Sequence, residues 1–149
     1  MNILVKVFVS AMFSILAAGC VSAPAYEEFA SVIYPPLPLD GRIYFYRTST
    51  LGAAMQPVVK VDGEEIGKAT PSGFFYVDRL AGNHEISIMT KTEKTLSVTL
   101  RDSEVKYVRF DVNVGVFVGD VEPVLVDAAV GQEELKELLY TGDERVAAR

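Results

Sequence analysis

The chain has 149 residues, a formal net charge of −6 at pH 7 and a hydrophobic fraction of 50%. An acidic chain without clustered lysine and arginine lacks the basic surface that phosphate binding requires, so we expect no nucleic-acid partner. Cys20 is the only cysteine in the sequence, which excludes an intramolecular disulfide. Any folded domain must therefore depend on its hydrophobic core.

The N-terminus has the pattern of an export signal. Lys6 provides a positive charge, and an apolar run of about a dozen residues follows from Val7 to Ala18. This run is shorter than the roughly 20 apolar residues that cross a bilayer as a helix, which favours a cleaved signal over a retained anchor. Residues 1–19 are therefore predicted to be a signal peptide.

The predicted signal ends in the sequence Leu-Ala-Ala-Gly-Cys at residues 16–20. This sequence resembles the lipobox of bacterial lipoproteins. The resemblance implies that the thiol of Cys20 carries diacylglycerol and that its new amino group carries a fatty acid such as palmitate. These chains would anchor the protein to the membrane. Val21 stands where an aspartate favours inner-membrane retention, which implies an outer-membrane location facing the periplasm. No other cofactor is expected.

Residues 20–40 are predicted to be the lipidated N-terminus and a proline-rich tether. Pro24, Pro35, Pro36 and Pro38 interrupt any regular period, and polyproline II extends by about 3.1 Å per residue. Such a tether would hold the following domain away from the membrane. The alternative is that its large apolar residues pack on the domain as an extra edge element: Tyr26, Phe29, Ile33 and Tyr34.

Residues 41–141 are predicted to form one domain of β-strands, because apolar and polar residues alternate along most of it. The predicted strands include residues 42–47, 58–61, 85–88, 95–100 and 105–118. The last has the clearest alternation, with Val108 and Phe110 on one face and Tyr107 and Arg109 on the other. A helix would not separate these residues in this way.

Turn residues separate the predicted strands. Asp62-Gly63 favours a tight hairpin, because glycine accepts the positive φ of primed turns, and residues 81–83 and 101–103 are also predicted turns. We therefore predict an all-β fold, an Ig-like β-sandwich of about six to eight strands. Residues 132–140 are predicted to form one short C-terminal helix that covers an open end of the sandwich, and residues 142–149 a flexible tail.

Four segments carry a family resemblance: GRIYFYR at residues 41–47, VKVDGEEIG at 59–67, GFFYV at 73–77 and LAGNHEI at 80–86. In this order they resemble the DUF2846 family of small bacterial lipoproteins, and the middle segments are similar to the PEGA repeat. The resemblance covers most of the predicted domain and implies a β-sandwich. It implies no activity, because the family has no known function.

Catalytic chemistry has little support in the sequence. His84 is the only histidine, no nucleophile or phosphate-loop motif is present, and a hydrolase would need His84 as its base. The position of His84 after a Gly-Asn turn favours a structural role, with the ring bonded to backbone. We therefore predict no catalytic residues and no enzyme activity.

Acidic residues gather in two regions, around Asp62, Glu64 and Glu65 and along residues 111–127. Their spacing does not match a calcium loop, which needs oxygen ligands at short regular intervals. No metal site is predicted, and solvated charge that keeps sheet edges from pairing is the simpler interpretation.

Tyrosines and arginines on the strand faces opposite the predicted core form a candidate binding face. Tyrosine and arginine stack on sugars and anchor protein partners, so this face would suit an envelope protein or a cell-wall glycan. The alternative is that the tether or the terminal helix covers it. The candidate residues are Tyr44, Tyr46, Tyr76, Tyr107, Arg42, Arg47 and Arg109.

These observations predict a lipid-anchored envelope lipoprotein that acts as a non-catalytic binding or scaffolding module facing the periplasm. The alternative is a peptidoglycan- or polysaccharide-binding module, for which the tyrosine face is the sequence signal. A weak hydrolase that uses His84 is a third hypothesis.

Overall fold

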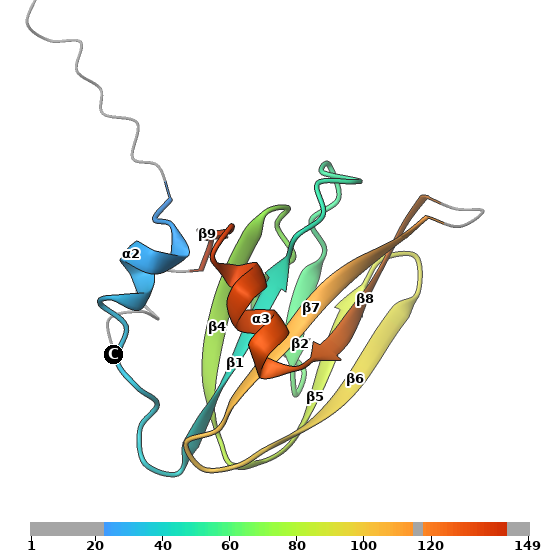
Figure 1. Cartoon of the computed structure of the whole chain (residues 1–149). Coiled ribbons are helices and arrows are strands. Elements are labelled where there is room, and N and C mark those ends of the chain that lie inside the picture. The colour runs from blue at the N-terminus through green and yellow to red at the C-terminus, as the bar shows by residue number, and fades with distance from the viewer. Residues whose placement is uncertain (1–22, 115–117, 143–149) are drawn as a thin grey trace, which may run out of the picture.

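The computed structural model of the chain describes residues 23–114 and 118–142. The predicted signal peptide, Cys20, Val21 and residues 143–149 of the predicted tail lie outside the described residues. Within them, two β-sheets pack against each other and two short helices lie on the outer side of one sheet (Figure 1). The predicted all-β sandwich is confirmed.

The larger sheet has five strands in the order β8-β7-β1-β4-β9. Its central strand β1 pairs with β4 in antiparallel fashion and with β7 in parallel fashion. The strand bounds are Asp40–Arg47 for β1, Gly73–Leu80 for β4, Val105–Val114 for β7, Val118–Val126 for β8 and Leu139–Tyr140 for β9.

The smaller sheet has four antiparallel strands in the order β3-β2-β5-β6. The predicted tight turn joins β2 to β3, and both of its residues have positive φ, 53° at Asp62 and 83° at Gly63. The bounds are Val58–Val61 for β2, Glu64–Lys68 for β3, Gly82–Met89 for β5 and Glu93–Leu100 for β6.

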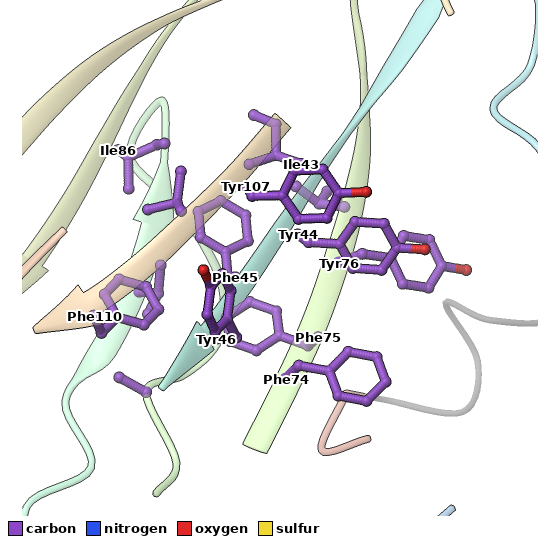
Figure 2. Packing of buried hydrophobic residues seen from close by; sticks show 14 of the residues in the cluster. Ile43, Tyr44, Phe45, Tyr46, Phe74, Phe75, Tyr76, Ile86, Tyr107 and Phe110 are labelled. Carbon is purple, nitrogen blue, oxygen red and sulfur yellow. The ribbon is translucent and has the colours of Figure 1, made fainter. Parts of the chain in front are cut away.

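Aromatic rings fill the space between the two sheets. The ring of Phe45 on β1 stacks on those of Phe75 and Phe110, at centroid distances of 5.3 and 6.0 Å. Buried aliphatic residues of the smaller sheet, such as Val59 and Ile86, complete the core. Figure 2 shows Phe45 and Phe110 on this side of β1, with Tyr44 and Tyr76 on the other side.

Two predicted elements have different bounds in the structure. Residues 105–118 are not one strand: β7 ends at Val114, and Val118 begins the antiparallel partner β8. Apolar and polar residues alternate along β7 and β8 alike, because side chains in any strand have a period of two. The alternation therefore did not indicate where β7 ends and β8 begins. The C-terminal helix α3 spans Ala128–Leu135 instead of residues 132–140, and Leu139–Tyr140 is strand β9.

Helix α3 also lies in a different place from the one predicted. It packs on β7, where a Cβ at Gly131 would come within 2.4 Å of the Tyr107 ring. The helix therefore covers the outer face of the five-stranded sheet and not an open end of the sandwich.

A second helix, α2 (Tyr26–Ala30), lies within the predicted tether (Figure 1). Its residue Phe29 is 4% exposed and belongs to the core, and Tyr26 and Ile33 pack against that core. This part of the chain is therefore not a free tether; it packs on the domain, which was the alternative interpretation. Tyr34 is the exception among the four apolar residues, since it is 70% exposed.

Candidate functional site

Six of the seven candidate residues lie on the outer side of the five-stranded sheet, which helices α2 and α3 cover. Arg47 instead has the parity of Phe45 on β1 and lies on the inner side. All four candidate tyrosines are at most 6% exposed, and Arg42 and Arg47 are also buried. The prediction of an exposed aromatic face is therefore wrong for these residues. Only Arg109 remains partly exposed. The alternative interpretation, a face covered by other parts of the chain, describes the structure.

Helix α2 covers this face through aromatic contacts and backbone bonds. The Phe29 ring stacks on that of Tyr140 at 4.2 Å between centroids and meets the Phe74 ring edge-on at 5.3 Å. The amide of Tyr26 donates to the Leu138 carbonyl at 3.2 Å. Burial beneath this cover raises the pKa of Tyr44 to about 12. The cover is therefore a packed layer and part of the fold.

Helix α3 holds the other half of the face through Glu134. Its carboxylate accepts a 2.6 Å bond from the Tyr46 hydroxyl and a 2.9 Å bond from Arg109, which also binds Asp111. Burial, followed by the bond to Glu134, raises the pKa of Tyr46. Tyr46 and Arg109 thus have partners within the chain and fasten α3 to the sheet.

Arg47 has a structural role at the end of β1. Its fully buried guanidinium donates to the carbonyls of Met55 at 2.8 Å and Ala69 at 3.2 Å, and also to that of Leu51. Burial lowers the pKa of Arg47, and no carboxylate pairs with it among the described residues. The side chain holds the loop between β1 and β2 in place.

Arg42 and Tyr76 are the candidate residues that line the larger of two cavities in the described part of the chain. Arg42 makes a bidentate pair with Asp78 across the β1–β4 ladder, at 2.7 and 2.8 Å, and its Cζ lies 4.2 Å from the centroid of the Tyr76 ring. Burial opposes the charge of Arg42, but the bonds to Asp78 raise its pKa overall. This pair forms part of the wall of a groove.

The groove has a volume of about 890 Å³ and separates the proline-rich segment from the rest of the domain. We define the β4 groove by three walls: residues 34–38, residues 76–79 of β4 and residues 64–66 of β3. In Figure 1 the segment after α2 runs beside β4 along this side of the domain. The volume is in the range of small-molecule and cofactor sites, about 300–1,000 Å³.

One wall of the β4 groove is an open sheet edge. Strand β9 pairs with β4 only at Gly73 and Phe74, and no other described strand pairs with that edge. The register shows which amides of β4 face outward. The Ala81 amide donates to the Leu39 carbonyl on the β1 side, and successive amides of a strand point to opposite sides. The amides of Asp78 and Leu80 therefore face away from β1. No described group accepts a bond from either amide.

The charge of the groove is negative. Asp40, Glu64, Glu65 and Asp78 line it together with Arg42 and Arg79, which leaves two negative charges in excess. Asp78 pairs with Arg42, and Glu64 pairs with Arg79 at 2.7 Å. Asp40 and Glu65 are in no ion pair among the described residues.

His84 lies outside the groove, at the start of β5. One ring nitrogen is 2.6 Å from the Asp62 carboxylate and the other is 2.8 Å from the Leu80 carbonyl. The predicted bond to backbone is confirmed. The bond from His84, with a second one from the Glu85 amide, lowers the pKa of Asp62. Neither partner is a serine, threonine or cysteine side chain that a histidine base could activate.

Neither a metal-binding cluster nor a membrane-spanning helix is present in the described part of the chain. Residues 23–114 and 118–142 hold no group of three or more His, Cys, Asp or Glu side chains placed to bind a metal ion. No helix within those ranges combines the length and apolar character needed to cross a membrane.

Sequence reasoning missed most of the β4 groove. The sequence pattern placed Tyr34 and the prolines in a tether. It indicated that Glu64 and Glu65 are solvated surface charges. The three walls lie about 10 to 40 residues apart along the chain, so no local pattern indicates that they meet. The only available signal was the concentration of large apolar residues in a proline-rich segment.

The chain was compared with known proteins. The family described as "Protein of unknown function (DUF2846)" matches residues 40–121, which is more than half of the chain. An uncharacterized protein of Haemophilus influenzae is 27% identical over 130 residues, which cover 84% of this chain and 77% of that protein. No solved structure matches the chain. The chain therefore belongs to the DUF2846 family.

Proposed function

We propose that this protein is an exported lipoprotein, anchored through Cys20 on the periplasmic side of the outer membrane, that binds an envelope partner in its β4 groove. The export pattern, the lipobox-like sequence and Val21 support the anchor and the location. The observation that carries the binding role is the 890 Å³ groove between the proline-rich segment and the open edge of β4. No catalytic step is part of the proposal.

The packing of the N-terminal segment determines how far from the membrane the lipid anchor would hold the domain. The amide of Tyr140 donates to the Pro24 carbonyl at 2.9 Å, so the folded part begins four residues after Cys20. At about 3.3–3.6 Å per residue, these four steps span at most about 14 Å. The domain would therefore lie close to the lipid headgroups and would not stand off on a long tether.

A glycan-binding module is the second candidate function, but its main support, an exposed face of tyrosines, is absent from the described part of the chain. The tyrosines that would stack on sugar rings are buried under α2 and α3. Tyr34 is the exposed tyrosine that lines the groove. Capture of the protein by purified cell wall, with loss of capture in Tyr34→Ala, would favour this candidate over a protein partner.

The hydrolase hypothesis depends on His84 and can be tested separately. Both ring nitrogens lie within hydrogen-bond distance of Asp62 and Leu80. We expect His84→Gln to leave cellular function unchanged wherever the protein still folds. Loss of cellular function in this variant, at an unchanged melting temperature, would support the hydrolase hypothesis.

The anchor is tested by metabolic labelling with a palmitate analogue and by the mass of the purified protein. We expect labelling of the native chain, no labelling of Cys20→Ala, and a mass that corresponds to a lipidated chain beginning at Cys20. An uncleaved and unmodified N-terminus would contradict the proposal.

The binding role is tested by photo-crosslinking in intact cells. A photoreactive residue is placed at Leu37 or Glu65 in the groove, or at Ser97, which is exposed on β6 in the other sheet. We expect both groove positions to give the same discrete adduct, which should be absent at Ser97. Equal adducts at all three positions, or none, would contradict a recognition site in the groove.

A further inference from the structure

We infer that the β4 groove takes an extended, lysine- or arginine-bearing segment of a partner protein, which adds as a strand to the open edge of β4. The inference rests on the proposed function and names the chemistry of the partner. Strand addition provides affinity through main-chain hydrogen bonds and specificity through pockets for alternate side chains.

The backbone of β4 provides the template for such a strand. Strand β9 already pairs with this edge, and its Thr141 neighbour donates to the Phe74 carbonyl at 2.8 Å. An added strand would continue where that pairing stops, toward the outward-facing amides of Asp78 and Leu80. Within the described part of the chain, the Asp78 carbonyl accepts a single long bond, of 3.4 Å, from the Arg79 side chain, and a main-chain N–H would replace it.

The proline-rich segment explains why the chain's own residues leave this edge open. Pro35, Pro36 and Pro38 line the groove opposite β4. A proline has no N–H to donate, so three prolines within four residues cannot form a regular ladder with β4. The segment lies close enough to form a wall and remains unable to pair.

The charges of the groove favour a basic partner. Two carboxylates, those of Asp40 and Glu65, line the groove without an ion-pair partner among the described residues. A lysine or arginine on the added strand would supply the missing positive charge. Such charge complementarity favours the correct partner and penalises an acidic one.

Apolar groups of the groove match the other face of an added strand. Leu37 and Tyr34 are about 70% exposed on one wall, and Ile66 on β3 is partly buried on another. Side chains of a strand alternate in direction, so a segment that alternates basic and apolar residues places the two kinds on opposite sides. This alternation defines the probe for the test.

The test uses the full chain, purified with its lipid in detergent, and three labelled ten-residue peptides with blocked ends. The first alternates valine and lysine, the second alternates valine and glutamate, and the third is the first with N-methyl groups on the peptide bonds of one edge. We expect the first to bind, the second not to bind, and the third to bind about tenfold more weakly or worse, because it lacks the donors that pair with β4.

Matched variants locate the binding. Leu80→Pro removes an outward N–H while the β1 ladder is kept, and Leu80→Val keeps that N–H; only the proline variant should weaken binding. Glu65→Lys should weaken it, whereas Glu93→Lys, the same charge change on β6, should not. Melting temperatures measured by circular dichroism show that each variant folds.

Three results would overturn the inference. In the first, the N-methylated peptide binds as tightly as its unmethylated parent. In the second, the valine–glutamate peptide binds as tightly as the valine–lysine peptide. In the third, Leu80→Pro and Leu80→Val change the binding equally. If these occur while the groove positions still crosslink in cells, the proposed binding role stands with a different occupant, such as a lipid surface or a glycan. If the crosslinks are also absent, both proposals fail.

Discussion

The two sheets of this protein bury their faces differently. In the four-stranded sheet, strand β6 alternates between buried and exposed residues toward its C-terminal end, and its outer face carries Ser97 and Thr99. In the five-stranded sheet, seven successive residues of β1 are buried, from Gly41 to Arg47. The first sheet has one core face and one solvent face, whereas the second has two core faces because α2 and α3 cover its outer side.

The difference shows that alternation identifies a strand but does not identify what covers its outer face. Composition provides that information. The outer face of the five-stranded sheet carries tyrosine and phenylalanine, and a strand that is apolar on both faces is typical of a sheet covered on both sides. With this face covered by α2 and α3, we expect a partner to meet this sheet at an edge, and the β4 edge is the one that lines the groove.

The largest effect is expected from matched truncations on the two faces of β4. Phe74 points toward α2, Phe75 points into the sandwich, and both are at most 3% exposed. Each change to alanine should lower the free energy of unfolding by about 3–5 kcal/mol, because both leave cavities in packed regions. Ser97→Ala, on the solvent face of β6, should change it by less than about 0.5 kcal/mol. Urea denaturation measures all three.

If Phe74→Ala cost as little as Ser97→Ala, the outer face would not be a second core.

Removal of the α2 contact should have the next largest effect. Phe29→Ala removes the ring that packs on Tyr140 and Phe74, and it should cost about 3 kcal/mol. A helix of five residues opens locally once its anchor is lost, so protease cleavage near α2 should also accelerate. Tyr34→Ala, at an exposed position, is the control and should change neither. Unchanged cleavage of Phe29→Ala would contradict the packed N-terminal layer.

A smaller effect is expected where α3 approaches the sheet. A Cβ at Gly131 would lie 2.4 Å from Cγ of Tyr107, so Gly131→Ala forces the helix outward and should cost about 1–3 kcal/mol. In a Tyr107→Ala background the same change should cost almost nothing. A double-mutant cycle by chemical denaturation measures the coupling. Equal costs in both backgrounds would mean that α3 does not rest on Tyr107.

The smallest effect concerns the exposed end of the four-stranded sheet. His84 and the Glu85 amide lower the pKa of Asp62, so the ionised Asp62 is favoured in the folded state. Its contribution is present above the ordinary pKa of an aspartate and is lost as the pH falls through the lowered value. Asp62 is about half exposed, so solvent screening limits the contribution to less than about 1 kcal/mol.

Asp62→Asn should therefore be slightly less stable than the native chain at pH 7, and the difference should disappear near pH 2. Denaturation curves across this range provide the measurement. A stability difference between the two proteins that grows toward low pH would contradict a lowered pKa of Asp62.

Much of the sandwich could be predicted from the sequence, because local chemistry determines it. The Asp62-Gly63 turn and the alternation of Val108 and Phe110 with Tyr107 and Arg109 each predicted a feature that the structure contains. These signals depend on turn geometry and on period two, which act over a few residues.

The rest depends on contacts between distant residues. Phe29 packs on Tyr140 from the other end of the chain, and α3 is placed by Tyr107, so neither cover leaves a local pattern. The groove combines Pro36, Glu65 and Asp78 for the same reason. A proline-rich segment predicted a tether, but its aromatic residues determined where most of it lies.

The most direct measurement is residue-resolved amide hydrogen exchange along β4 in the full chain, observed by NMR. Val77 donates toward β1, whereas Asp78 and Leu80 face the groove. The account predicts slow exchange at Val77, fast exchange at Asp78 and Leu80, and slower exchange at these two when the valine–lysine peptide is added. Protection of Asp78 and Leu80 equal to that of Val77 without any peptide would show that the edge is already closed and would contradict the account.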